Sequence, residues 1–151
     1  MIEQNLIKTY ENSFKKNWNL PALTDYKGNR SYTYGELAGE IAKIHLLFSE
    51  FGIEKGDKIS LVGKNHSSWS ILFMATITYG AVIVPILHEF NSDSIESIID
   101  HSNSKLVFIN SALWENINPD NIKVTTIESP SFKLLKSSHD NAEEIVNSIN
   151  N

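Results

Sequence analysis

The stretch Lys58–Glu89, KISLVGKNHSSWSILFMATITYGAVIVPILHE, decides the fold of this chain. Between Lys64 and the closing glutamate it contains no Lys, Arg, Asp or Glu, so most of its surface is expected to be buried. Its composition changes at Gly80. Residues 71–75 (ILFMA) suit a helix, whereas residues 81–84 (AVIV) are mostly β-branched and favour a strand.

The same stretch begins with another apolar run, residues 59–62 (ISLV), which Gly63 closes. Residues 65–68 offer side-chain oxygens that can cap a helix, so the stretch is predicted to fold as strand, helix and strand. A strand at 81–84 that is apolar on both faces is typical of the middle of a parallel sheet covered by helices. From that central placement, Ile83→Asp is expected to abolish soluble folding, because an unpaired buried charge costs several kcal/mol.

The segment from Trp69 to Leu87 is also long enough to be tested as a membrane span, which needs about 20 apolar residues. Gly80 and Pro85 interrupt it, hydroxyl side chains dilute it, and no Lys or Arg cluster flanks it. We therefore expect no transmembrane segment.

The N-terminal part of the chain has its own local signals. Leu6, Tyr10 and Phe14 recur every four residues and predict an amphipathic helix. Two short runs, PALTD at 21–25 and RSYTY at 30–34, flank a Gly-Asn turn and predict a β-hairpin. A capping box formed by Thr33 and Glu36 then begins a helix with one apolar stripe, which ends at Gly52. The residues of this stripe are Leu37, Ile41, Ile44, Phe48 and Phe51.

Alternating strands and helices continue toward the C-terminus. A helix is expected around residues 95–99, strands at 105–109 and 124–127, and a short helix capped by Asn110. The predicted fold class is α/β, with three layers, a mostly parallel sheet flanked by helices and the N-terminal β-hairpin. We assign residues 1–130 to this α/β unit and residues 131–151 to a weakly structured continuation.

Composition narrows the classes of function. The 151 residues carry a formal net charge of -5 and a single arginine, Arg30, which argues against nucleic acid as a partner. The absence of cysteine excludes disulfides, thiolate nucleophiles and Cys-ligated zinc. The N-terminus lacks a cationic segment followed by an apolar one, so we expect no secretory signal and a cytoplasmic location.

Two short motifs are candidate chemical sites. Gly63-Lys64 lies between a predicted strand and helix, where free amides suit an anion, but the first glycine and the hydroxyl of a phosphate loop are missing. His88-Glu89 lacks the second histidine of the zinc-protease helix. It follows a predicted central strand, however, where open α/β sheets form ligand crevices, so it is a candidate pocket lining.

The remaining histidines have no metal-ligand spacing, and the three tryptophans are interpreted as packing residues. We assign no catalytic, cofactor-binding or metal-ligating residue.

Five segments in order and spacing resemble the opening of the adenylate-forming superfamily, which includes acyl-CoA synthetases, luciferases and peptide-synthetase adenylation domains. They cover about residues 18 to 110. The segments are PALTDYKGN, SYTYGELAGEIAKIHLLF, GIEKGDKISLVGKNHSSW, TYGAVIVPILHEF and IIDHSNSKLVFI. PILHEF at 85–90 and Asn17-Trp18 are most similar to the long-chain fatty acid–CoA ligases.

This resemblance implies the N-terminal subdomain of an enzyme that activates a fatty acid with Mg-ATP and transfers the acyl group to CoA. The Gly/Ser/Thr-rich phosphate loop, the ribose-binding acidic motif and the C-terminal lysine of that family match no stretch of this chain. ATP, Mg²⁺ and CoA are therefore expected only in a full-length enzyme, and this fragment is expected to be inactive by itself.

The expected partner is the remainder of the ligase, with self-association through an exposed apolar surface as a further expectation. Two other hypotheses stay open. One is a self-contained flavodoxin-like domain that binds a nucleotide or flavin at the Gly63–Ser68 turn, and the other is a non-catalytic interaction domain.

Overall fold

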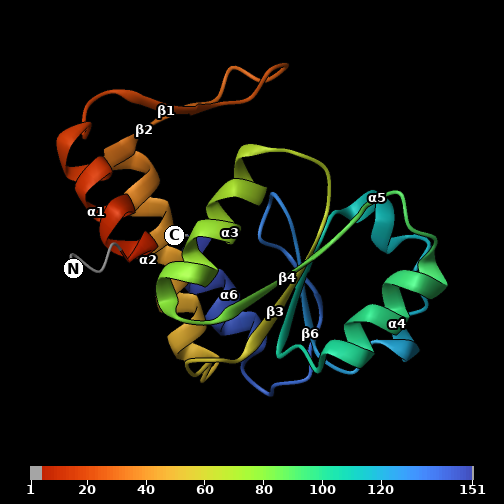
Figure 1. Ribbon diagram of the computed structural model, residues 1–151. Coiled ribbons are helices and arrows are strands. Elements are labelled where there is room, and N and C mark those ends of the chain that lie inside the picture. The colour runs from red at the N-terminus through yellow and green to blue at the C-terminus, as the bar shows by residue number, and fades with distance from the viewer. Residues whose placement is uncertain (1–4, 151) are drawn as a thin grey trace.

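The computed structural model describes residues 5–150 and shows an α/β fold around a five-stranded sheet (Figure 1). The strand order is β4-β3-β5-β6-β7, in which the first four strands are parallel and β7 runs antiparallel to β6. The elements are α1 (Leu6–Lys16), β1 (Pro21–Thr24), β2 (Ser31–Thr33), α2 (Tyr34–Glu50), β3 (Lys58–Val62), α3 (Ser67–Tyr79), β4 (Val82–Ile86), α4 (Ser92–Ser102), β5 (Leu106–Ile109), α5 (Ser111–Trp114), the 3₁₀ helix η1 (Pro119–Asn121), β6 (Thr125–Glu128), β7 (Leu134–Lys136) and α6 (Ala142–Asn150).

Helices cover both faces of the sheet, as Figure 1 shows with α3 and α6 on one side and α4 on the other. The larger core lies under α2, α3 and α6, where Phe48 and Phe108 are fully buried. The second core lies under α4 and the segment of α5 and η1, with Ile95 and Ile122 at its centre. The α/β class, the mostly parallel sheet and the flanking helices predicted from the sequence are thus confirmed.

The predicted capping box is present at the N-terminus of α2. The Glu36 amide donates to Thr33 Oγ1 at 3.2 Å, and the Thr33 amide donates to Glu36 Oε2 at 2.8 Å. These two bonds satisfy amides that the helix itself leaves free. Because the same threonine ends β2, the box also fixes the angle at which the hairpin enters the helix.

The hairpin and α1 pack against the start of α2. Strands β1 and β2 pair antiparallel, and the Phe14 ring meets the Tyr34 ring edge to face at 5.2 Å. Trp18 lies so close to Gly35 that a Cβ added there would be 2.7 Å from the indole atoms Cε2 and Nε1. Gly35 therefore permits the contact between the α1 region and α2.

Two glycines of α2 are expected to respond oppositely to alanine. Gly39→Ala should stabilise the protein by about 0.5–1 kcal/mol, since an added Cβ meets nothing within 4 Å and alanine favours the helix. Gly35→Ala must displace Trp18, so it should lose that gain and leave the protein less stable than Gly39→Ala. Urea unfolding measures both, and equal stabilisation of the two variants would contradict the close Trp18 contact.

The position of β4 differs from the prediction. The run at 81–84 was expected in the middle of the sheet, but β4 is an edge strand with only β3 beside it. Ile83 and Val84 are half-buried rather than buried, and the strand continues through Pro85 to Ile86. An edge strand tolerates proline because the missing N–H is not needed for a second ladder. The apolar sequence signalled burial but carried no information on strand order.

The weak structure expected for residues 131–151 is also wrong for the described part up to Asn150. Strand β7 adds an antiparallel strand to β6, and α6 packs against α2 with Ala142, Ile145 and Val146 buried. The segment is polar because only one stripe of a short amphipathic helix faces the core.

Within residues 5–150, no helix combines the length and apolar character needed to cross a membrane.

Candidate functional site

The carboxyl ends of the internal strands β3, β5 and β6 meet at one end of the sheet. The Asn110 amide donates to Val62 O at 3.2 Å, and the Ser129 amide donates to Ile109 O at 3.0 Å, which ties the three strand ends together. The chain leaves β3 into α3 on one face, and it leaves β5 toward α5 on the other face. Adjacent parallel strands with connections on opposite faces create a crevice, the usual ligand position of open α/β sheets.

At this end of the sheet, Asp25 from the turn of the hairpin caps the N-terminus of α3. The Ser67 amide donates to Asp25 Oδ1 and the Ser67 hydroxyl donates to Asp25 Oδ2, both at 2.8 Å. A carboxylate is favourable here because the first amides of a helix carry partial positive charge. These bonds join residues that are 42 positions apart in the sequence, and they hold the hairpin against the carboxyl end of the sheet.

His66 and Ser68 complete the polar cluster. His66 is the N-cap of α3, with Nδ1 accepting from the Ser68 amide at 3.3 Å and Nε2 lying 3.4 Å from Asp25 Oδ2. The Ser129 hydroxyl donates to Ser68 Oγ at 3.2 Å, so the strand end of β6 joins the same cluster. Each of these groups has a protein partner, and the cluster acts as a helix cap.

This geometry argues against the nucleotide hypothesis for the Gly63–Ser68 turn. The Ser67 amide, which would face a bound phosphate, is already taken by the Asp25 carboxylate. A phosphate would therefore have to displace an anionic side chain and would be repelled by it. Lys64 is exposed and, within the described part of the chain, forms no ion pair with this cluster. The flavodoxin-like alternative is not favoured.

The cap should make stability depend on pH. Burial raises the pKa of Asp25, but the two Ser67 hydrogen bonds and the charges of His66 and Arg30 outweigh it, so the pKa is lowered. A carboxyl whose pKa is lower in the folded state stabilises the protein above its unfolded pKa and loses that contribution as pH falls through the folded pKa. The contribution should thus be complete at neutral pH and fade below about pH 4.

Thermal unfolding between pH 7 and pH 3 measures this effect against Asp25→Asn, which cannot ionise. The two proteins should differ most at neutral pH and converge in acid. The comparison is needed because the pKa of Glu36 is lowered too, by the hydrogen bonds from the Thr33 amide and hydroxyl. A constant difference across this pH range would show that the Asp25 charge does not matter.

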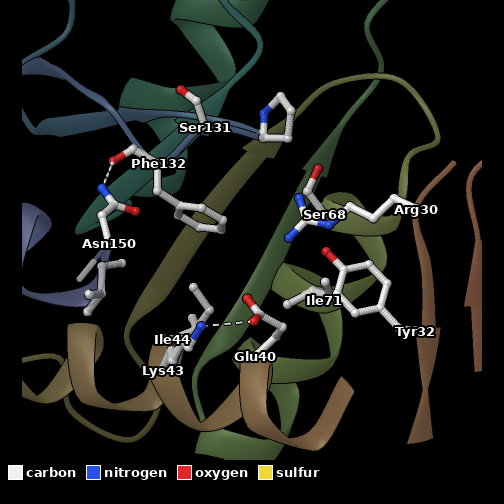
Figure 2. A pocket seen from close by; sticks show the side chains of 12 residues that line it. Arg30, Tyr32, Glu40, Lys43, Ile44, Ser68, Ile71, Ser131, Phe132 and Asn150 are labelled. Atoms are coloured by element: carbon white, nitrogen blue, oxygen red, sulfur yellow. Dashed lines mark hydrogen bonds and ion pairs between the residues drawn. The ribbon is translucent and has the colours of Figure 1, made fainter. Parts of the chain in front are cut away.

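A cavity of about 280 Å³ opens beside this cluster, between the hairpin, α2 and α6 (Figure 2). Figure 2 shows Arg30, Tyr32 and Ser68 along one wall and Ser131, Phe132 and Asn150 along the other. Glu40, Lys43, Ile44, Ile71, Pro130 and Ile149 complete the lining.

The polar groups of this cavity are largely engaged with one another. The Arg30 guanidinium lies 4.9 Å from the centre of the Tyr32 ring, and Lys43 Nζ pairs with Glu40 Oε1 at 3.0 Å. Asn150 Nδ2 donates to the carbonyl of Phe132 at 3.2 Å. Across residues 5–150, no buried side-chain N or O atom lacks a hydrogen-bond partner.

The residues predicted at the end of β4 lie apart from this cavity. His88 Nε2 and Glu89 Oε1 are 3.5 Å apart, and the Glu89 side chain is 70% exposed. Because β4 is an edge strand, its end forms no crevice between two neighbouring strands.

In the part of the chain that the structure describes, no group of three or more His, Cys, Asp or Glu side chains could hold a metal ion.

Other histidines have structural contacts. His45 Nε2 lies 3.0 Å from the carbonyl of Ala75 and 3.0 Å from Thr78 Oγ1, which joins α2 to α3. Burial lowers the pKa of His45, and the bond to Ala75 offsets this only in part. His139 Nδ1 lies 2.8 Å from Thr125 Oγ1.

The sequence did not reveal Asp25, the residue that organises the polar cluster. Asp25 ends the strand-like run PALTD, and no residue within ten positions of it in the sequence indicates a contact with Ser67. The Arg30–Tyr32 contact was likewise hidden, although their spacing of two places both side chains on one face of a strand.

Comparison with known proteins finds relatives over most of the chain. Residues 10–149 match the family model described as AMP-binding enzyme. The 4-hydroxybenzoate–CoA/benzoate–CoA ligase of Rhodopseudomonas palustris is 32% identical over 82 residues, which covers 54% of this chain and 15% of the ligase. The acetyl-coenzyme A synthetase of Bacillus subtilis is 24% identical over 117 residues, which covers 77% of this chain and 20% of the synthetase.

Among solved structures, a benzoate CoA ligase from Burkholderia xenovorans LB400 has the same fold. The TM-score is 0.78 at 20% sequence identity, over 95% of this chain and 28% of that protein. The chain thus spans between 15% and 28% of the length of these three proteins. Its fold is that of the N-terminal subdomain of such enzymes.

Proposed function

Since the chain belongs to the AMP-binding enzyme family, we propose that it forms the N-terminal part of an acid–thiol ligase. Such an enzyme activates a carboxylic acid with ATP to an acyl-adenylate and then transfers the acyl group to the thiol of CoA. The observation that carries the proposal is the match of the family model to residues 10–149. The names of two relatives, a CoA ligase and a coenzyme A synthetase, support the same reaction class.

In this proposal ATP, Mg²⁺ and CoA bind to the full-length enzyme, and none of their sites is assigned to residues of this chain. The phosphate loop and lysine that such chemistry requires match no stretch of the 151 residues. The role proposed for this part is structural. Its buried sheet braces one wall of the acyl-binding region, and the chain by itself is inactive.

For the acid we propose a long-chain fatty acid, on the basis of Asn17-Trp18 and of PILHEF at 85–90, which resemble the fatty acid–CoA ligases. An aromatic acid is the second candidate, favoured by the ligase that is named for 4-hydroxybenzoate and benzoate. The proposed location of the enzyme is the cytoplasm.

Pyrophosphate release tests both the reaction class and the acid. The purified chain and the full-length protein encoded by the same gene are each incubated with ATP, Mg²⁺, CoA and palmitate, benzoate or acetate. We expect release above background only from the full-length protein, fastest with palmitate. Fastest release with benzoate would replace the fatty acid by the aromatic candidate.

Two outcomes would overturn the proposal itself. One is a full-length protein that forms neither pyrophosphate nor an acyl-CoA with any acid. The other is a gene that ends after Asn151, because no chain would then supply the phosphate loop. Release from the short chain would contradict the proposed inactivity and would direct attention to the cavity of Figure 2.

A further inference from the structure

A second hollow, the α1–α2 groove, lies between helix α1 and helix α2, which run beside each other in Figure 1. Its volume is about 360 Å³, a usual size for a small-molecule site. Side chains of α1, of α2 and of the last turn of α3 line it, together with Trp18 from the loop after α1. It shares no lining residue with the cavity of Figure 2.

Helix α1 does not bury its apolar stripe. None of its side chains is fully buried, and Ile7, Tyr10 and Phe14 are half-buried where they line the groove. An amphipathic helix on a globular protein normally covers such a stripe against the core. The groove therefore leaves apolar surface of α1 accessible to a small molecule.

Three rings form the aromatic wall of the groove, which we define as Tyr10, Phe14 and Trp18. Two of them are held by contacts within the chain. Trp18 packs against Gly35, whose amide donates to the Trp18 carbonyl at 2.9 Å, and Phe14 meets the Tyr34 ring edge to face. Aromatic rings favour other rings as partners, and a wall that is ordered before binding reduces the entropic cost of binding.

The charges at the groove cancel each other. Glu11 and Lys15 lie one helical turn apart among the lining residues and form an ion pair. A charged ligand would have to break this pair or leave water without a counter-charge of its own. The groove therefore favours a neutral ligand.

His45 is the polar group whose protonation the surrounding contacts define. Its Nε2 lies 3.0 Å from the Ala75 carbonyl and 3.0 Å from Thr78 Oγ1. A carbonyl can only accept, and the Thr78 hydroxyl already donates its hydrogen to the Met74 carbonyl at 2.6 Å. Nε2 must therefore carry the ring hydrogen and donate it. In the neutral ring, which burial favours by lowering the pKa of His45, Nδ1 is then an acceptor.

This Nδ1 atom is open. It has no hydrogen-bond partner among residues 5–150, and no side-chain nitrogen or oxygen without a partner is enclosed in that range. Because His45 lines the groove, the apolar walls are accompanied by one accessible acceptor. A single acceptor in an apolar site selects a ligand that carries a matching donor.

We propose that the α1–α2 groove binds a small, neutral aromatic alcohol of the phenol class, with its ring on the aromatic wall and its hydroxyl donating to His45 Nδ1. The site is separate from the ligase chemistry proposed above and does not depend on it. A bound molecule contacts α1, α2 and α3 together, and it therefore stabilises the docking of α1 on the rest of the fold.

Titration of the ¹⁵N-labelled chain with three probes, followed by NMR, tests the proposal. The probes share one ring: p-cresol carries the donor, p-xylene replaces the hydroxyl by a methyl group, and 4-methylbenzoate replaces it by an anion. We expect saturable shift changes confined to groove residues, including the Trp18 indole N–H. Binding of p-cresol should be several-fold tighter than that of p-xylene, and 4-methylbenzoate should bind most weakly.

The preference for p-cresol should disappear in acid. Protonation of His45 places a hydrogen on Nδ1, which can then no longer accept. The preference should thus be complete at about pH 7.5 and fall as the pH passes through the lowered pKa of His45. The affinity for p-xylene should change little. The groups that face His45 are Tyr79 of α3 and the α1 side chains Tyr10, Glu11 and Lys15. Lys15 lowers the pKa of Glu11, so Glu11 stays ionised above about pH 5.

A matched pair of variants places the site. Ala38→Leu adds a side chain into the groove, whereas Ala42→Leu makes the same change one turn later on α2 at an exposed position outside it. Ala38→Leu should weaken p-cresol binding at least about tenfold, and Ala42→Leu should leave it unchanged. Thermal unfolding confirms that both variants fold, and the titrations of the unmodified chain test the proposal without them.

Three results would overturn the proposal. Shift changes that do not saturate, or that lie outside the groove, would show that no site exists here. Equal affinities for p-cresol and p-xylene at about pH 7.5 would show that His45 Nδ1 selects nothing. Equal binding by Ala38→Leu and Ala42→Leu would place the ligand elsewhere. None of these measurements involves pyrophosphate release, so the ligase proposal stands or falls separately.

Discussion

Leu61→Asp is expected to abolish folding of the chain. Leu61 is 1% exposed in β3, and its strand is paired on both sides, with Pro85 and Phe108 as the register neighbours. A carboxylate there has neither water nor a cation, and burying it unpaired costs several kcal/mol, in addition to about 2 kcal/mol of lost apolar burial. Domains of this size are stable by only about 5–15 kcal/mol. The expected result is insoluble protein or a circular dichroism spectrum without a cooperative thermal transition.

Ile83→Asp is the matched control, and the structure changes its expected result. The central placement predicted from the sequence implied that this variant could not fold. Ile83 instead lies half-buried on the edge strand, where a carboxylate can reach water. It should lower stability by about 1–3 kcal/mol and keep a cooperative transition. If Ile83→Asp were as damaging as Leu61→Asp, β4 would not be an edge strand in solution.

Asp25→Ala is expected to lower the free energy of unfolding by about 2–3 kcal/mol. The substitution removes both carboxylate acceptors of Ser67, which is only 5% exposed. It leaves the helix amide without a partner and the hydroxyl with only its 3.4 Å contact to His66 Nδ1. Hydrogen bonds to a charged group are the stronger kind, and an unpaired buried donor adds its own cost. Urea unfolding at neutral pH gives the value.

A double-mutant cycle with Ser67→Ala separates this cap from unrelated effects of the Asp25 substitution. The two single variants should each destabilise the protein, and the double variant should lose less than their sum, because both changes remove the same interaction. Asp25→Asn keeps an acceptor and should lie between the wild type and Asp25→Ala. Strict additivity would mean that the Asp25–Ser67 contact contributes nothing measurable.

The family assignment and the polar cluster have different consequences for function. Membership in the AMP-binding enzyme family rests on residues 10–149 as a whole. The cluster of Asp25, His66 and Ser67 is built as a cap whose partners are all within the protein. Within the described residues, its contribution is to hold the hairpin against the N-terminus of α3.

Most elements of the fold were predictable because their signals are local. The capping box of Thr33 and Glu36 needs only four residues, and the strand, helix and strand of 58–86 follow from composition on either side of Gly80. Gly80 itself adopts φ 94°, the left-handed conformation that ends α3 and that glycine adopts without strain. Such features depend on neighbours within a turn or two of the chain.

The candidate site was not predictable in this way. The sequence marked Gly63–Ser68 and His88-Glu89, yet the structure places the former against Asp25 and the latter at an open edge. Both outcomes depend on contacts between segments that are far apart in the chain. A polar residue at a strand end can cap, pair or face a ligand, and its own neighbours in sequence do not distinguish these roles.

By itself, the sequence determined the α/β class, the order of most elements and the apolar character of residues 65–88. Only the tertiary structure decided that β4 lies at one edge of the sheet and β7 at the other, that α6 packs against α2, and that Asp25 caps α3. The physical reason is that propensity, capping and periodicity act over a few residues. Strand order and long-range hydrogen bonds are selected by the packing of the whole chain.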